Sequence, residues 1–163
     1  MRLFVAAELS DEMKNSAIQT MHEMKKAGVK GSFVPKQNLH VTLAFIGEVD
    51  SATEVKEALK TVSVKPFRLS FTELGHFGDL IWVGVKGNQG LSSAVRSVRE
   101  AFDRAGIDYD RKKFEPHITL IRKAAGPWQH APAPKGDMMV NKISLMKSER
   151  RDGKQVYTEV MSV

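Results

Sequence analysis

Two short segments of the sequence combine a residue that can move protons with one that can donate a hydrogen bond. His40-Val41-Thr42-Leu43 and His117-Ile118-Thr119-Leu120 share the pattern His-x-Thr-x. Because side chains alternate between the two faces of a strand, each histidine shares a face with the threonine two residues later. Histidine titrates at about pH 6.5, so two histidines can act as base and acid in one turnover. The motifs therefore predict His40 and His117 as a catalytic pair.

This pair suits ring opening at phosphorus. A water must lose a proton on one side of the phosphorus while the leaving ribose oxygen gains one on the other, and a symmetric cleft places one histidine on each side. Thr42 and Thr119 would donate hydrogen bonds to the non-bridging phosphate oxygens, which stabilises charge without a metal. We therefore expect no metal or other cofactor. The remaining histidines, at positions 22, 76 and 130, have no partners at metal-ligand spacing.

Two further residues lie at equivalent places, five positions after each histidine. Arg122 follows His117, where it would add a bidentate contact to the phosphate or would be a solvated strand end. Phe45 follows His40, where it would stack on a base or fill the core. Both residues are included among the predicted substrate-binding positions.

The two motifs belong to an internal repeat. His40 and His117 are 77 residues apart (117 − 40), and the strand openings at Leu3 and Leu80 are also 77 residues apart (80 − 3). A shared offset over strand, helix and strand indicates two copies of one unit. Two such copies predict two similar lobes, related by a pseudo-twofold axis, that each contribute one motif to a shared cleft.

Hydrophobic periodicity and breaker residues predict the elements that carry these motifs. A helix is expected between Ser10 as its N-cap and Gly28 as its stop, and the methionines on one face of this helix are expected in the core. Asp152-Gly153 predicts a hairpin turn. Further helices are expected over residues 52–62 and 91–105, and strands over residues 3–7, 67–74, 80–85, 114–122, 140–146 and 156–161 and within residues 32–47. Three prolines predict a loop over residues 124–136, and its part 126–136 is a candidate determinant of substrate specificity.

Composition narrows the class of protein. The 163 residues suffice for one domain with its own core, and 42% hydrophobic and 27% charged residues are typical of a folded globular chain. The absence of cysteine excludes disulfides and thiolate chemistry. A net charge of +6 favours polyanionic ligands. The apolar run at the N-terminus is too short for a signal peptide or a membrane span, so a cytoplasmic location without membrane association is expected.

At the two His-x-Thr motifs the sequence resembles the two-histidine phosphoesterase superfamily, and within it the RNA 2′,3′-cyclic phosphodiesterases, also called 2′-5′ RNA ligases. The resemblance covers nearly the whole chain. Besides the two motifs, it includes the segments 2–6, 43–47 and 116–122, and Ile143-Ser144-Leu145 with Ser148, Gly153 and Tyr157.

The resemblance implies an α+β fold over residues 1–163, a single two-lobed domain in which antiparallel sheets line a central cleft and helices lie outside. It also implies hydrolysis of a 2′,3′-cyclic phosphate on RNA or a nucleotide to a 2′-phosphate. In the family's mechanism, the histidine matching His40 protonates the leaving 3′ oxygen and the one matching His117 activates water. The same chemistry, with a 5′-hydroxyl in place of water, would join RNA ends through a 2′-5′ linkage.

Two other functions remain open from the sequence. A non-catalytic RNA-binding module would use the same basic cleft without turnover. Another phosphodiesterase of the superfamily would act on a small cyclic nucleotide, a cyclic ADP-ribose phosphate or 2′-5′ oligoadenylate. A monomer is the default expectation for the oligomeric state.

Overall fold

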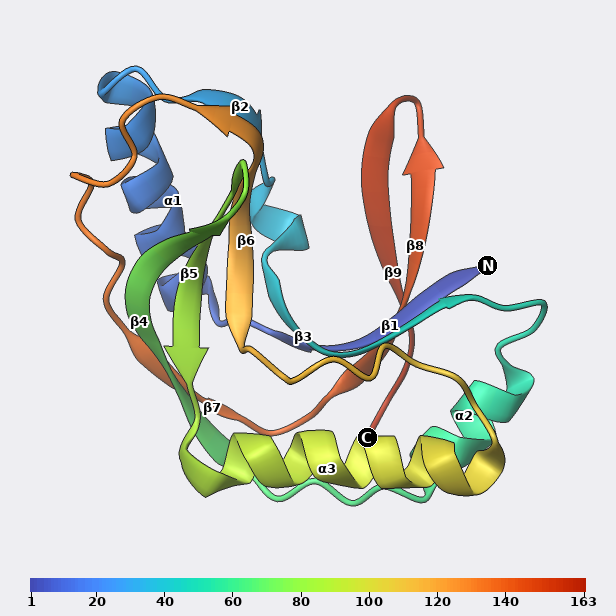
Figure 1. The fold of residues 1–163 in the computed structure, drawn as a ribbon. Coiled ribbons are helices and arrows are strands. Elements are labelled where there is room, and N and C mark those ends of the chain that lie inside the picture. The colour runs from blue at the N-terminus through green and yellow to red at the C-terminus, as the bar shows by residue number, and fades with distance from the viewer.

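The computed structural model describes all residues from Met1 to Val163 and consists of two antiparallel β-sheets with three α-helices (Figure 1). The helices are α1 (Asp11–Lys26), α2 (Thr53–Lys60) and α3 (Asn88–Ala105), and a short 3-10 helix, η1, covers Lys36–Asn38. The strands are β1 (Arg2–Glu8), β2 (Lys30–Phe33), β3 (His40–Glu48), β4 (Phe67–Phe77), β5 (Leu80–Lys86), β6 (His117–Ala125), β7 (Asp137–Val140), β8 (Ser144–Arg151) and β9 (Lys154–Ser162).

The strand order shows the duplication expected from the sequence. One sheet has the order β3-β1-β8-β9 and the other has the order β2-β6-β5-β4-β7. The run β3-β1-β8 in the first sheet corresponds to β6-β5-β4 in the second when β1 is matched with β5 and β3 with β6. This is the correspondence that the 77-residue offset predicts. The α+β fold with two antiparallel sheets is therefore confirmed, and each sheet carries one His-x-Thr motif.

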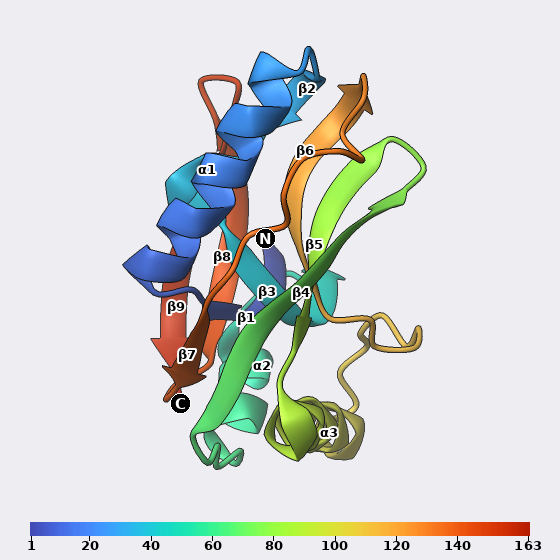
Figure 2. The ribbon, with the colours of Figure 1, turned by 90° about the vertical axis from the view of Figure 1, so that its left-hand side faces the viewer.

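Local signals explain where the helices begin and end. The Ser10 hydroxyl accepts a hydrogen bond of 3.3 Å from the backbone N–H of Met13, which caps α1 as predicted. Gly106 ends α3 in the left-handed conformation, with φ of 70°. The methionines of α1 at positions 13, 21 and 24 are buried in the core. Figure 2 shows α1 on the outside of the molecule and α3 at its lower end.

A single cluster of 37 buried apolar residues fills the interior and draws on both sheets and all three helices. Phe102 of α3, Leu59 of α2 and Met24 of α1 are fully buried in this cluster. The apolar sides of the strands that carry the two motifs also belong to it, through Val41 and Ile118. The core thus anchors both motif strands. None of the helices is long and apolar enough to cross a membrane.

Two strand predictions were wrong. Residues 140–146 do not form one strand, because β7 ends at Val140 in the five-stranded sheet and β8 begins at Ser144 in the other. Ile143 lies between them and exchanges backbone hydrogen bonds of 2.9 and 3.0 Å with Val163. The strand expected to open at residue 114 begins only at His117, after a proline that cannot donate to a ladder. The turn at Asp152-Gly153 is confirmed and joins β8 to β9.

Candidate active site

A bulge in each motif strand decides which side chains face the same way. In the pairing of β3 with β1, Val5 is opposite Ala44 and Ala6 is opposite Thr42, so Leu43 is an extra residue. In the pairing of β6 with β5, the partners step from Thr119 to Ile121, so Leu120 is the extra residue. A bulge shifts the alternation of faces by one residue. Beyond the bulges, Phe45 and Arg122, each five residues after a motif histidine, therefore lie on the same face of the strand as the histidine and the threonine.

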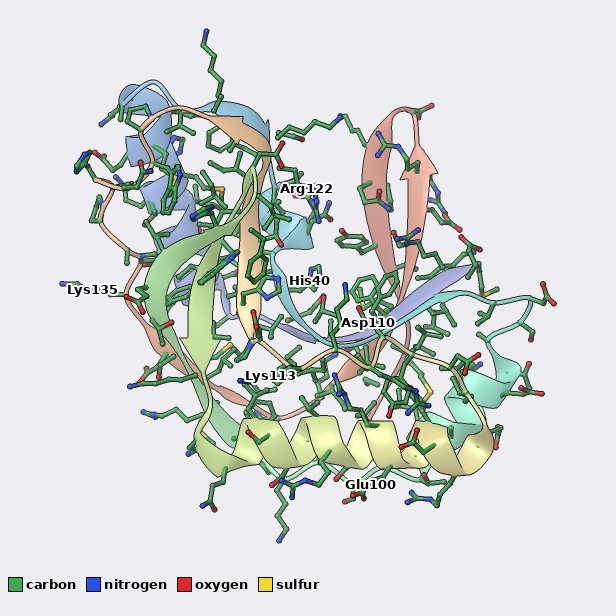
Figure 3. The ribbon with its side chains drawn as sticks, viewed as in Figure 1. His40, Glu100, Asp110, Lys113, Arg122 and Lys135 are labelled. Atoms are coloured by element: carbon green, nitrogen blue, oxygen red, sulfur yellow. The ribbon has the colours of Figure 1, made fainter.

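The predicted site residues therefore line one cleft. His40, Thr42 and Phe45 reach it from β3, and His117, Thr119 and Arg122 reach it from β6. Figure 3 shows the side chains of His40 and Arg122 between β6 and the β8–β9 hairpin. The cleft has a volume of about 1030 Å³. Segment 126–136 is not among the residues that line this cleft, so its role in substrate specificity stays a prediction. The segment contacts α1, where the Thr20 hydroxyl donates to the Pro132 carbonyl over 2.9 Å.

The two histidines are held in the same way. His40 Nδ1 donates a hydrogen bond of 2.7 Å to the carbonyl oxygen of Asn38, and His117 Nδ1 donates one of 2.7 Å to that of Glu115. A carbonyl oxygen can only accept, so Nδ1 carries the proton in both rings. The Nε2 atom of each ring is therefore the one available for proton exchange.

The surroundings of the two rings differ. His40 Nε2 lies 3.0 Å from the Thr42 hydroxyl, whereas His117 Nε2 makes no hydrogen bond within the protein. Burial lowers the pKa of His40 below its usual value, and the hydrogen bond to Asn38 opposes this shift. The charge of Arg122 lowers the pKa of His40 further, as does His117. A neutral His40 accepts the Thr42 hydroxyl proton at Nε2 as a hydrogen bond.

Aromatic rings pack around His40. The centroid of its ring lies 5.0 Å from that of Phe4 in β1 and 5.2 Å from that of Tyr157 in β9. Phe45 lies partly buried against the same small cluster, and the guanidinium of Arg2 lies 5.0 Å from its ring centroid. Phe45 packs against other aromatic rings and also lines the cleft, so its stacking on a base stays a prediction.

The cleft carries unpaired positive charge. Its carboxylates, Glu48 and Glu149, are already paired. Glu48 lies 3.3 Å from the N-terminal ammonium group. Hydrogen bonds from Lys147 and then Arg151 hold the pKa of Glu149 below its usual value. Four cationic side chains on the cleft have no carboxylate partner, namely Arg2, Arg122, Arg150 and Lys154. The cleft therefore favours an anion with more than one charge.

Sequence reasoning missed the residues that hold His40 from outside its own strand. The buried Asn38 accepts from His40 through its carbonyl, and its side-chain amide donates over 3.0 Å to the carbonyl of Gln155 in β9. The side-chain amide of Gln155 in turn donates to the hydroxyl of Ser148. A polar residue two positions before each motif histidine was visible in the sequence, but nothing local indicates that its carbonyl orients the ring. The chain forms no cluster of three or more His, Asp or Glu side chains suited to a metal ion.

Comparison with known proteins agrees with this architecture. A family model described as the 2′-5′ RNA ligase superfamily matches residues 10–152. The RNA 2′,3′-cyclic phosphodiesterase of Archaeoglobus fulgidus is 35% identical over 130 residues, which cover 75% of this chain and 72% of the relative. The protein of the same name from Escherichia coli is 31% identical over 131 residues, covering 76% and 73% of the two chains.

Solved structures extend the similarity to the whole fold. The apo form of E. coli LigT superposes with a TM-score of 0.84 at 28% identity and covers 99% of this chain and 95% of that chain. LigT complexed with 3′-AMP superposes with a TM-score of 0.82. Two antiparallel sheets that each present a His-x-Thr strand to one cleft define the class of two-histidine phosphoesterases. The chain belongs to the 2′-5′ RNA ligase superfamily, and the resemblance seen in the sequence is confirmed.

Proposed function

We propose that this protein is an RNA 2′,3′-cyclic phosphodiesterase that opens the cyclic phosphate to a 2′-phosphomonoester through paired acid–base catalysis by His40 and His117. The observation that carries the proposal is the matched anchoring of the two rings. Each Nδ1 donates over 2.7 Å to the carbonyl two residues upstream, which leaves both Nε2 atoms for proton exchange at a shared cleft.

The reaction requires one proton to leave and another to arrive. A water attacks the phosphorus and gives its proton to one Nε2, while the bond from phosphorus to the 3′ oxygen breaks and that oxygen takes a proton from the other Nε2. The hydroxyls of Thr42 and Thr119 and the guanidinium of Arg122 donate to the non-bridging oxygens, where negative charge increases in the transition state. Phe45 forms part of the wall against which the substrate lies.

The family resemblance assigns His40 as the acid and His117 as the base. Burial keeps the pKa of His40 low in the free protein, so the ring binds substrate in its neutral form. A bound phosphate places negative charge beside this ring and favours its protonated form. We therefore propose that His40 acquires its proton as the anionic substrate binds, and that it then donates this proton to the leaving oxygen.

The relatives support RNA as the substrate class, because those from Archaeoglobus fulgidus, Geobacillus stearothermophilus and Escherichia coli carry the name RNA 2′,3′-cyclic phosphodiesterase. The unpaired cations of the cleft fit a ligand with several phosphates. The same site would join RNA ends when a 5′-hydroxyl takes the place of water, because the proton transfers are the same.

The proposal is tested by hydrolysis of a 2′,3′-cyclic mononucleotide and of a short RNA with a cyclic phosphate end, in the presence of EDTA. We expect the wild type to turn over and His40→Ala and His117→Ala each to lose about 10²- to 10⁴-fold in kcat, the range for a general acid or base. Wild-type binding of RNA without turnover would instead identify a binding module. Turnover of only a non-RNA cyclic nucleotide or 2′-5′ oligoadenylate would identify another activity of the superfamily.

A further inference from the structure

An exposed aromatic side chain lies beside His117, outside the cleft wall described above. Phe77, the last residue of β4, is 44% exposed, and its ring centroid lies 5.3 Å from that of His117 in an edge-on arrangement. The same ring lies 5.2 Å from that of Trp82 in β5. His117 lines the cleft, whereas Phe77 and Trp82 do not. These two residues therefore form an aromatic shelf that adjoins the cleft at His117.

The sheet beneath the shelf is shaped to hold the indole ring. Gly75 is opposite Trp82 in the pairing of β4 with β5, and a Cβ atom at Gly75 would lie 2.2 Å from an indole carbon. The ring thus rests directly on the backbone of β4. The indole Nε1 is buried without a hydrogen-bond partner, a state that costs free energy. Packing alone therefore holds Trp82 in place, on the face of the sheet that carries His117 and Thr119.

Phe77 is exposed although the turn that follows it is fixed. The carbonyl of Asp79, within the β4–β5 turn, accepts a hydrogen bond of 2.8 Å from the backbone N–H of Ala124 in β6. His76 Nδ1 donates over 3.1 Å to the carbonyl of Gly78, and the His76 ring lies 5.4 Å from that of Trp128. A ligand that covers Phe77 would therefore not have to order this turn first.

A flat apolar surface beside a proton-transfer group at a phosphate site matches one kind of chemical group, a nucleobase. Bases stack on aromatic side chains whatever their sequence, since every base has a π-face. The cleft has aromatic rings of its own, Phe4 and Tyr157, on the side of His40. We infer that the shelf of Phe77 and Trp82 stacks the base of a second nucleotide, on the His117 side of the cyclic phosphate.

This inference rests on the proposed function, and the second base has two possible sources. It belongs either to the nucleotide that precedes the cyclic end or to the 5′-terminal nucleotide of a strand whose hydroxyl replaces water. The first source is tested with a dinucleotide that ends in a cyclic phosphate and with the same molecule lacking its first base. The second is tested by ligation to a 5′-hydroxyl oligonucleotide with and without its first base.

One of these two experiments, dinucleotide hydrolysis or ligation, uses the substrate whose base lies on the shelf. In that experiment we expect Phe77→Ala to lower kcat/KM by about 5- to 100-fold when the base is present, which is the range for removal of a stacking aromatic side chain. The loss should be several-fold smaller when the base is absent, and Phe77→Tyr should restore most of it. Met139→Ala is the control, because Met139 is also an exposed apolar residue, 48% exposed on β7. Equal losses with and without the base in both arms would show that Phe77 only positions His117, and would overturn the inference.

A binding measurement separates this inference from the proposed function. The chain has two tryptophans, so Trp128→Phe leaves Trp82 as the only indole reporter. We expect the dinucleotide or the 5′-hydroxyl oligonucleotide to quench Trp82 fluorescence more strongly than its base-deficient counterpart. Base-dependent quenching without wild-type turnover would support the shelf and refute the phosphodiesterase proposal. Turnover without base-dependent quenching would refute the shelf and leave the phosphodiesterase proposal intact.

Discussion

The tip of the β8–β9 hairpin supplies two of the unpaired cations on the cleft, Arg150 and Lys154. Figure 1 shows this hairpin opposite β6, the strand that carries Arg122. Replacing both tip cations with alanine should weaken RNA binding and reduce its dependence on salt, because fewer counterions are released when the complex forms.

The expected size of the effect follows from the number of charges. For single-stranded nucleic acid, the slope of log K against log salt is about −0.7 for each neutralised phosphate. If all four unpaired cations contact phosphates, the slope is about −2.8, and the affinity falls about 50-fold between about 50 and 200 mM salt. The double variant retains two of these cations, so its slope is about −1.4 and its affinity falls about 7-fold over the same range.

The assay is fluorescence anisotropy of a short labelled RNA with a 2′-phosphate end, which binds without being consumed. The matched control is Lys65→Ala with Arg104→Ala, which removes the same net charge from exposed positions that have no ion pair and do not line the cleft. We expect the control to keep a slope close to that of the wild type. Equal slopes for the two double variants would refute the assignment of Arg150 and Lys154 to the RNA path.

Four further predictions concern the site and the core. Thr42→Val and Thr119→Val should each lower kcat by about 10²- to 10³-fold with little change in KM, as expected for donors to developing charge; a change confined to KM in steady-state kinetics would contradict this. Arg122→Gln should raise the pKa of His40, whose low value comes first from burial and also from this charge; NMR titration of the His40 ring checks the direction, and an unchanged or lower pKa would contradict it. The pKa of His40 is lowered in the folded state, so the unfolded chain takes up a proton near pH 6.5 that the folded chain does not. The free energy of unfolding should therefore fall as the pH drops below about 6.5, and this fall should be smaller in His40→Gln. Denaturant unfolding at several pH values measures the difference. Phe102→Ala should cost about 3–5 kcal/mol in the same unfolding assay, because Phe102 is fully buried, and a loss below about 1 kcal/mol would contradict its place in the core.

Much of the site was visible in the sequence. The motif is local and repeats at a constant offset, so the pairing of His40 with His117 followed from the chain alone, and the structure brings both to one cleft. The helices were predictable for the same kind of reason. A cap such as Ser10, a stop such as Gly106 and a buried face at helical spacing act over a few residues, and all three are present in the structure.

Other features depended on partners that are distant in sequence. The interruption at residues 141–143 arises because β7 and β8 pair with strands of different sheets. Asn38 reaches His40 and the β9 backbone only once the hairpin lies against η1. A hydrophobic pattern reports which face of a segment is buried, but it does not report which strand covers its edge.

The sequence by itself revealed the two His-x-Thr motifs and their duplication, whereas the tertiary structure decided which neighbours share the cleft with them. Strict alternation along β3 and β6 would turn Phe45 and Arg122 away from the histidines. They face the cleft because bulges at Leu43 and Leu120 shift the alternation of faces. A bulge is a mismatch between two paired strands, so it exists only when β1 and β5 have set the register of their neighbours.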